Sequence, residues 1–99
     1  MKKRVTLSGN KMASREVLHT YLANKLSFPS YYGKNLDALH DCLTERSTPL
    51  HITITYADRL KEHLGDYGET LLQVLQNVTE ENERISLSVY TEKRPSLRR

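Results

Sequence analysis

Residues 31–45, which read YYGKNLDALHDCLTE, predict a short amphipathic helix that follows an aromatic loop. Asn35 is suited to cap the start of this helix, and Pro49 limits its far end. On a helical wheel of about 100° per residue, the leucines and Cys42 gather on one side, and His40 gathers with the acidic residues on the other side. We therefore expect the helix to pack through its leucines and to present carboxylates on its outer side.

Segments on both sides of this stretch predict three β-strands. Apolar and polar residues alternate in residues 5–8, 52–56 and 85–90. In all three, aliphatic side chains lie on one face and serine or threonine on the other. This alternation predicts a sheet that is covered on one face only.

Helical periodicity occupies the intervals between the predicted strands. Before the second strand, one helix starts after Ser14 and another starts after Asn35. After the second strand, residues 58–64 predict a helix that ends at Gly65.

The fourth and longest predicted helix starts at Asp66, where Asp66 and Glu69 have the spacing of a D-x-x-E variant of the capping box. Long helical connections join parallel strands through right-handed crossovers. We therefore expect an α/β fold of two layers, in which four helices cover a three-stranded parallel sheet with the strand order 1-2-3.

The formal net charge of +3 is a property of the two ends of the chain. Of the 15 basic residues, seven lie within positions 2–4 and 93–99, so that the remaining eight are outnumbered by 12 acidic residues. We expect one domain over residues 1–92 and a basic, disordered tail over residues 93–99. The body of the protein is therefore acidic, which argues against nucleic acid as its specific partner.

We find no sequence pattern of a signal peptide or of a membrane-spanning segment. The opening residues MKKR are not followed by the apolar segment of a signal peptide, and no apolar run approaches the roughly 18 residues that span a bilayer. The lone Cys42 cannot form an internal disulfide. We therefore expect a cytoplasmic protein without a membrane partner.

The helix and its leading loop carry a family resemblance. The pattern YYGxNLDALxDCLT over residues 31–44 closely resembles the signature of the barstar family, intracellular inhibitors of barnase-like ribonucleases. Pro29, Pro49-Leu50 and Leu72-Gln73-Val74 match as well, and the resemblance extends over nearly the whole chain. It implies the barstar fold, a three-stranded parallel sheet with helices, in agreement with the element order above.

The resemblance also implies a mechanism without catalysis, cofactor or metal. The helix and its loop would block the active site of a guanyl-specific extracellular ribonuclease in a 1:1 heterodimer. Asp41 would occupy the site of the substrate phosphate, and Asp37 would face basic residues at its edge. Tyr31 and Gly33 would pack around the catalytic histidine, and Glu81 matches an acidic contact residue of the family. The expected partner-binding residues are Tyr31, Gly33, Asn35, Leu36, Asp37, His40, Asp41, Thr44, Glu45, Arg46 and Glu81.

Several positions depart from the family pattern at the edge of this set. His40 and Arg46 stand where the pattern has tryptophans, Lys34 stands where it has glutamate, and Glu45 stands where it has glycine. These departures leave the partner open between a relative of barnase and a different toxin, for which the chain would be an immunity protein or antitoxin. A protonated His40 would repel a positive cleft, so we expect weaker inhibition below about pH 6.

Two other classes of function fit the sequence less well than inhibition does. A hydrolase could use His40 with Asp37 and Asp41, but the sequence has no zinc-protease histidine pair, phosphate loop or G-x-S-x-G motif. Cys42 falls on the apolar side of its helix, where a buried thiol is expected rather than a nucleophile. The basic ends could bind nucleic acid, but solubilising termini of this composition are more common.

Overall fold

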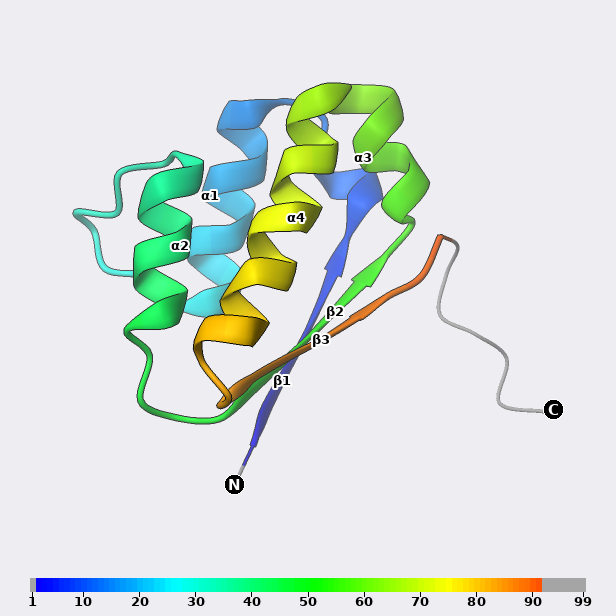
Figure 1. Ribbon diagram of the computed structural model, residues 1–99. Helices are drawn as coiled ribbons and strands as arrows, with labels where there is room; N and C mark the ends of the chain where they lie inside the picture. Colours follow the sequence, from blue (N-terminus) through cyan, green and yellow to red (C-terminus); the bar gives the residue numbers. More distant parts are fainter. Residues whose placement is uncertain (1, 92–99) are drawn as a thin grey trace, which may run out of the picture.

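The computed structural model of the protein describes residues 2–91. Its sheet consists of β1 (Lys3–Ser8), β2 (Leu50–Thr55) and β3 (Ile85–Val89), as Figure 1 shows. The strands are parallel and lie in the order β1-β2-β3, which confirms the predicted topology. The predicted tail at residues 93–99 lies outside the described residues.

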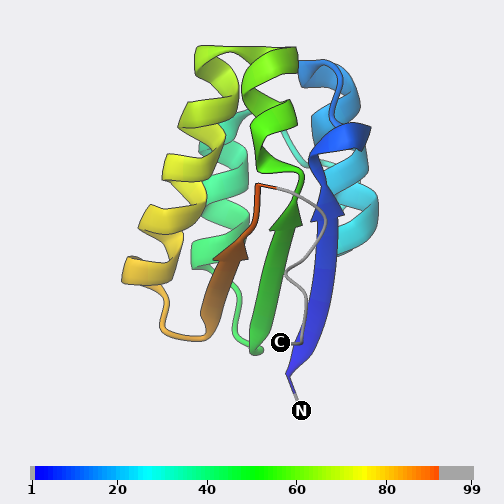
Figure 2. The same cartoon turned by 90° about the vertical axis from the view of Figure 1, so that its right-hand side faces the viewer.

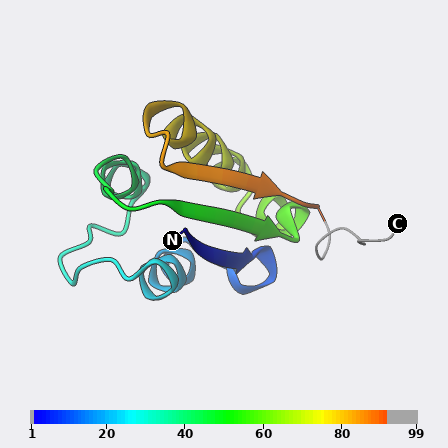
Figure 3. The ribbon, with the colours of Figure 1, turned by 90° about the horizontal axis from the view of Figure 1, so that it is seen from below.

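Four α-helices connect these strands. The chain passes from β1 through α1 (Arg15–Leu26) and α2 (Leu36–Thr44) to β2, and from β2 through α3 (Ala57–Leu64) and α4 (Asp66–Glu81) to β3. Figure 2 looks onto the uncovered face of the sheet, with the helices behind it, and Figure 3 shows the same arrangement from below. The protein is an α/β fold of two layers, as the alternation of the strands predicts.

The core lies between the two layers. It is formed by aliphatic side chains of the strands, such as Leu7 and Ile54, and by leucines of every α-helix, such as Leu22, Leu39 and Leu75. On the other face of the sheet, Thr6 is exposed and the His51 ring contacts the hydroxyls of the β3 serines. Leu-to-Ala changes in such a core typically cost about 2–5 kcal/mol, so burial fixes each helix against the sheet.

The first two helices begin at the predicted caps. The Ser14 hydroxyl accepts a hydrogen bond from the backbone N–H of Val17 at 3.2 Å, and the Asn35 side chain accepts one from the N–H of Ala38 at 2.7 Å. Since N-caps of this type are worth about 1 kcal/mol, Asn35 helps to hold the start of α2 in place.

The predicted capping box at the start of α4 is wrong. Gly65 alone separates α3 from α4, and Asp66 is already inside α4, where it cannot take the extended conformation of a cap. Glu69 pairs instead with Lys61 of α3, with 3.0 Å between the Lys61 Nζ and a carboxylate oxygen. Both acids lie in the first turn of α4, which still favours negative charge.

The chain after β1 also differs from the expected pattern. A single 3-10 turn, η1 (Gly9–Lys11), follows the strand, and a Cβ atom at Gly9 would lie 2.1 Å from the carbonyl oxygen of Tyr56. Tyr56, predicted within the second strand, has left it and adopts a positive φ of 53°. Only glycine at position 9 allows the two chain segments at the ends of β1 and β2 to approach this closely.

Candidate protein-binding surface

The α2 helix presents its acidic side outward, as its periodicity predicts. Leu39 and Leu43 are fully buried in the core. Asp37, Asp41 and Glu45 are exposed on the opposite side of the helix. A row of carboxylates is therefore mounted on an element that is fixed from behind by apolar packing.

Cys42 lies at the margin of the buried side of α2. It is half-buried, and burial raises the pKa of its thiol, to which the charges of Glu45 and Asp41 add. A thiol with a raised pKa is mostly protonated at neutral pH, so its environment does not activate it as a nucleophile.

The two tyrosines before α2 have different surroundings. Tyr31 is 85% exposed, whereas Tyr32 is only 6% exposed and packs on Phe28 with 4.7 Å between ring centroids. The loop therefore fixes one aromatic ring in the core and leaves the other exposed in the segment that leads into α2. Exposed tyrosines are among the residues that contribute most strongly to protein interfaces.

A buried histidine connects this loop to two helices. His19 of α1 is 1% exposed, and its ring nitrogens lie 2.7 Å from the hydroxyls of Tyr32 and of Tyr67 in α4. Burial lowers the pKa of His19, and the charge of Lys34 lowers it further. A neutral imidazole donates through one nitrogen and accepts at the other, so His19 satisfies both hydroxyls. His19 is therefore a structural support of the loop.

A second histidine lies on the acidic surface itself. The His40 Nε2 lies 3.0 and 3.1 Å from the two carboxylate oxygens of Glu81, and its Nδ1 lies 3.4 Å from a carboxylate oxygen of Asp41. The hydrogen bond to Glu81 raises the pKa of His40 most strongly, and Asp41 adds to this. The fold thus brings Glu81, at the end of α4, beside two expected contact residues of α2.

Asn82, just after α4, holds the C-terminal end of α2 in place. Its buried amide group lies 3.0 Å from the carbonyl oxygens of Leu43 and Arg46 and 3.3 Å from that of Thr44. The last carbonyl groups of a helix have no partners within the helix. The Asn82 amide supplies the missing hydrogen-bond donor from a distant part of the chain. The sequence alone did not indicate this role.

The structure distributes the eleven predicted contact residues over one loop, the whole length of α2 with the two residues after it, and the end of α4. Tyr31, Gly33 and Asn35 lie in the loop; Leu36, Asp37, His40, Asp41 and Thr44 lie in α2; Glu45 and Arg46 follow it; Glu81 ends α4. Thr44 donates to the His40 carbonyl oxygen at 2.9 Å, and the Arg46 Nε donates to that of Thr48 at 3.2 Å. Glu45 and Arg46 line a hollow of about 480 Å³ between the ends of α2 and α4.

Another histidine, His51, does not join this surface. His51 lies on the uncovered face of the sheet, where its ring contacts the hydroxyls of Ser86 at 2.6 Å and Ser88 at 3.1 Å.

Within residues 2–91, no three histidine, cysteine or acidic side chains are grouped so that they could hold a metal ion. None of the helices over the same residues is long and apolar enough to cross a membrane.

Comparison with known proteins places the chain in a family. The family model described as "Barstar (barnase inhibitor)" matches residues 2–92. A protein of Bacillus subtilis (strain 168) named "Putative ribonuclease inhibitor YrdF" is 40% identical over 80 residues, which cover 80% of this chain and 88% of the relative. The family model spans all of the helices and strands described above. The chain therefore belongs to the barstar family.

Proposed function

We propose that this protein inhibits a barnase-like, guanyl-specific extracellular ribonuclease by inserting α2 and the preceding loop into its active site. The observation that carries the proposal is the row of exposed carboxylates at Asp37 and Asp41, mounted on a helix that is packed from behind and preceded in the chain by the exposed Tyr31. The family description and the name of the Bacillus relative support a ribonuclease inhibitor.

The mechanism follows from the charge of the proposed target. A ribonuclease must hold a phosphodiester among lysine, arginine and histidine side chains, so its cleft is strongly positive. In the complex, the Asp41 carboxylate takes the place of a substrate phosphate, and the Asp37 carboxylate pairs with cations at the edge of the cleft. Tyr31 and Gly33 cover the surroundings of the catalytic histidine. The inhibitor itself performs no chemistry and needs no cofactor.

The remaining contact residues extend this interface. Asn35, Leu36 and Thr44 complete the contact along α2, while Glu45, Arg46, His40 and Glu81 form its edge. The complex is a 1:1 heterodimer, and the inhibitor acts in the cytoplasm, where it protects the cell from the nuclease.

The test is a titration of the purified protein into a barnase-like guanyl-specific ribonuclease while RNA cleavage is followed. We expect stoichiometric inhibition. Asp41→Ala should raise the inhibition constant at least about a hundredfold, because it leaves desolvated cations of the enzyme unpaired. Asp58→Ala, which removes an exposed carboxylate from α3, is the matched control and should inhibit like the parent protein. Absence of binding to such enzymes even at low salt would refute the proposal.

An immunity function against a different toxin is the second candidate. It is favoured by the positive side chain of Lys34 and by His40, which change the edge of the surface away from the family pattern. A toxin that is bound with nanomolar affinity through Asp41 but that does not cleave RNA would support this candidate over ribonuclease inhibition.

A further inference from the structure

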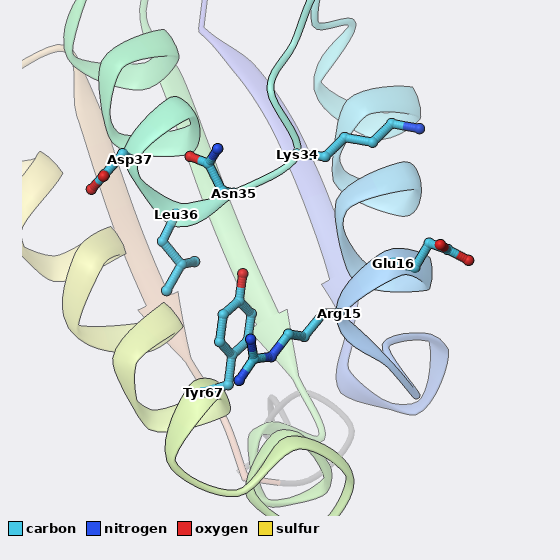
Figure 4. A pocket seen from close by; sticks show the side chains of 7 residues that line it. All are labelled: Arg15, Glu16, Lys34, Asn35, Leu36, Asp37 and Tyr67. Carbon is cyan, nitrogen blue, oxygen red and sulfur yellow. The ribbon is translucent and has the colours of Figure 1, made fainter.

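A cavity of about 470 Å³ adjoins the acidic surface. It opens between the start of α1, the loop before α2, the first turn of α2 and the start of α4, as Figure 4 shows. Asn35, Leu36 and Asp37 line this cavity and also belong to the predicted contact residues, so the cavity is continuous with the proposed interface.

The cavity contains an arginine that is held in place from within the fold. The Arg15 guanidinium lies over the Tyr67 ring, 4.2 Å from its centroid. The Tyr67 hydroxyl is in turn fixed by the buried ring of His19 at 2.7 Å. Stacking on an aromatic face restrains an arginine side chain while its N–H groups remain available to an acceptor.

This guanidinium has no acidic partner among residues 2–91. The ion pairs of arginine and lysine in this range join Arg59 to Glu62 and Lys61 to Glu69, and none includes Arg15. Glu16 and Asp37 also line the cavity, but in Figure 4 both carboxylates point away from the Arg15 guanidinium. The arginine is therefore restrained but not neutralised.

The apolar and positive groups of the cavity define what it can accept. Leu36 and the Tyr67 ring form an apolar wall beside the Arg15 guanidinium, and the exposed Lys34 stands at the rim. A planar guanidinium matches a carboxylate through two parallel hydrogen bonds, and the apolar wall suits the methylene groups that carry it. A polyanion such as RNA would be repelled by the acidic body, in which ten acidic residues outnumber four basic ones between positions 31 and 83.

We propose that this cavity receives a glutamate or aspartate side chain of the inhibited ribonuclease, with Arg15 as its partner. The proposal rests on the inhibitory function proposed above and adds a second requirement for the partner. The enzyme combines a basic cleft, which receives the carboxylates of α2, with an acidic side chain at its edge, which enters the cavity. Arg15 is then a determinant of specificity, because an enzyme with a basic or bulky apolar residue at that place would leave its guanidinium buried and unpaired.

The test uses the ribonuclease that the parent protein inhibits and that responds to Asp41→Ala. We expect Arg15→Ala to weaken inhibition by about tenfold or more, the usual effect of losing a charge-assisted hydrogen bond. Arg59→Ala, which removes an arginine from α3, should leave inhibition unchanged. In a scan of the enzyme's acidic residues to their amides, one substitution should weaken the parent inhibitor but have no further effect on Arg15→Ala.

Two results would overturn this inference. If Asp41→Ala impairs inhibition but Arg15→Ala inhibits as well as the parent protein, the cavity has no role although the inhibitory function stands. If Arg15→Ala weakens inhibition but no acidic residue of the enzyme is coupled to it, the occupant is not a carboxylate side chain. Urea unfolding shows whether Arg15→Ala has lost stability. If it has, Arg15→Gln replaces it, because this variant keeps part of the side-chain stem on Tyr67 and removes only the charge. Arg15→Gln should then show the same loss of inhibition.

Discussion

Adjacent residues in the loop before α2 have different surroundings, and the difference depends on contacts far away in the sequence. Tyr31 and Tyr32 are chemically identical, yet only Tyr32 meets Phe28 and His19 in the core. The sequence predicted that aromatic residues would accompany the acidic helix but not which of the two would be exposed. Neighbouring positions of an irregular loop have no fixed periodicity that assigns one to the interior.

At His19 we expect a dependence of stability on pH. Its pKa is lowered in the folded protein, so protonation favours the unfolded chain: the contribution of His19 is fully present above its ordinary pKa of 6.5 and is lost as pH falls toward its lower folded value. His19→Ala should lower the free energy of unfolding by about 2–4 kcal/mol, because it removes the hydrogen bonds of two tyrosine hydroxyls and leaves a void.

Urea unfolding of the parent protein and of His19→Ala at pH 8, 6.5 and 5.5 measures both effects. The difference in unfolding free energy between the two proteins should shrink as the pH falls. A difference that is constant over this range would show that His19 does not titrate differently in the folded and unfolded states.

At His40 we expect the opposite direction of titration and an effect on binding. Its pKa is raised, so in the free protein the positive charge persists to higher pH and lies among the carboxylates of Glu81 and Asp41. A basic active site favours the neutral form. Inhibition should therefore be weaker at pH 5.5 than at pH 8, and His40→Gln should reduce this difference severalfold. Comparing both inhibitors on the same enzyme cancels the enzyme's own titration; equal pH dependence of the two would exclude His40 as the cause.

The α2 helix is held by one asparagine side chain at each end, and the sequence predicts only one of the two contacts. Its N-cap, Asn35, acts within three residues and could be predicted from the local pattern. Asn82 binds carbonyl groups that lie 36 to 39 residues earlier, and no local pattern indicates such a contact. The failed capping box at Asp66 has a related cause, since whether a residue is a cap or the first turn depends on where the preceding helix ends.

Removing the Asn82 amide should therefore affect both folding and binding. Asn82→Ala removes the amide that binds three carbonyl groups at the end of α2, of which that of Leu43 still accepts from the Arg46 N–H, and we expect a loss of about 2–3 kcal/mol in the free energy of unfolding. Because the end of α2 is no longer tied to α4, the inhibition constant should also rise. Asn77→Ala, which changes a side chain of α4 that hydrogen-bonds to the exposed Gln73, is the control and should change stability by less than about 0.5 kcal/mol. Equal stability of the two variants would contradict this role of Asn82.

For the whole molecule, topology was the most predictable property. Three alternating strands separated by helical pairs allow few arrangements, and the strand order follows once both crossovers are right-handed and on the apolar face. The residues of the proposed site followed from the family resemblance, whereas their cross-element contacts, such as His40 with Glu81, required three-dimensional packing.

The acidic body should also control how fast the protein meets a basic partner. Attraction between the net negative region over residues 31–83 and a positive cleft accelerates encounter and is screened by salt. We expect the association rate constant to fall at least about tenfold between 50 and 500 mM NaCl, with a much smaller change in the dissociation rate. Stopped-flow measurements at several salt concentrations would test this, and a rate that is independent of salt would argue against steering.

The one-sided covering of the sheet offers a practical means of attachment. Thr6 is exposed on the face opposite the helices, and therefore on the far side of the molecule from α2. A Thr6→Cys variant would carry a thiol accessible to maleimide reagents at pH 7, while the native Cys42 has a pKa raised by burial and reacts more slowly. A sensor chip coated through position 6 would display every copy in one orientation, with the surface proposed to capture a nuclease directed toward the solution.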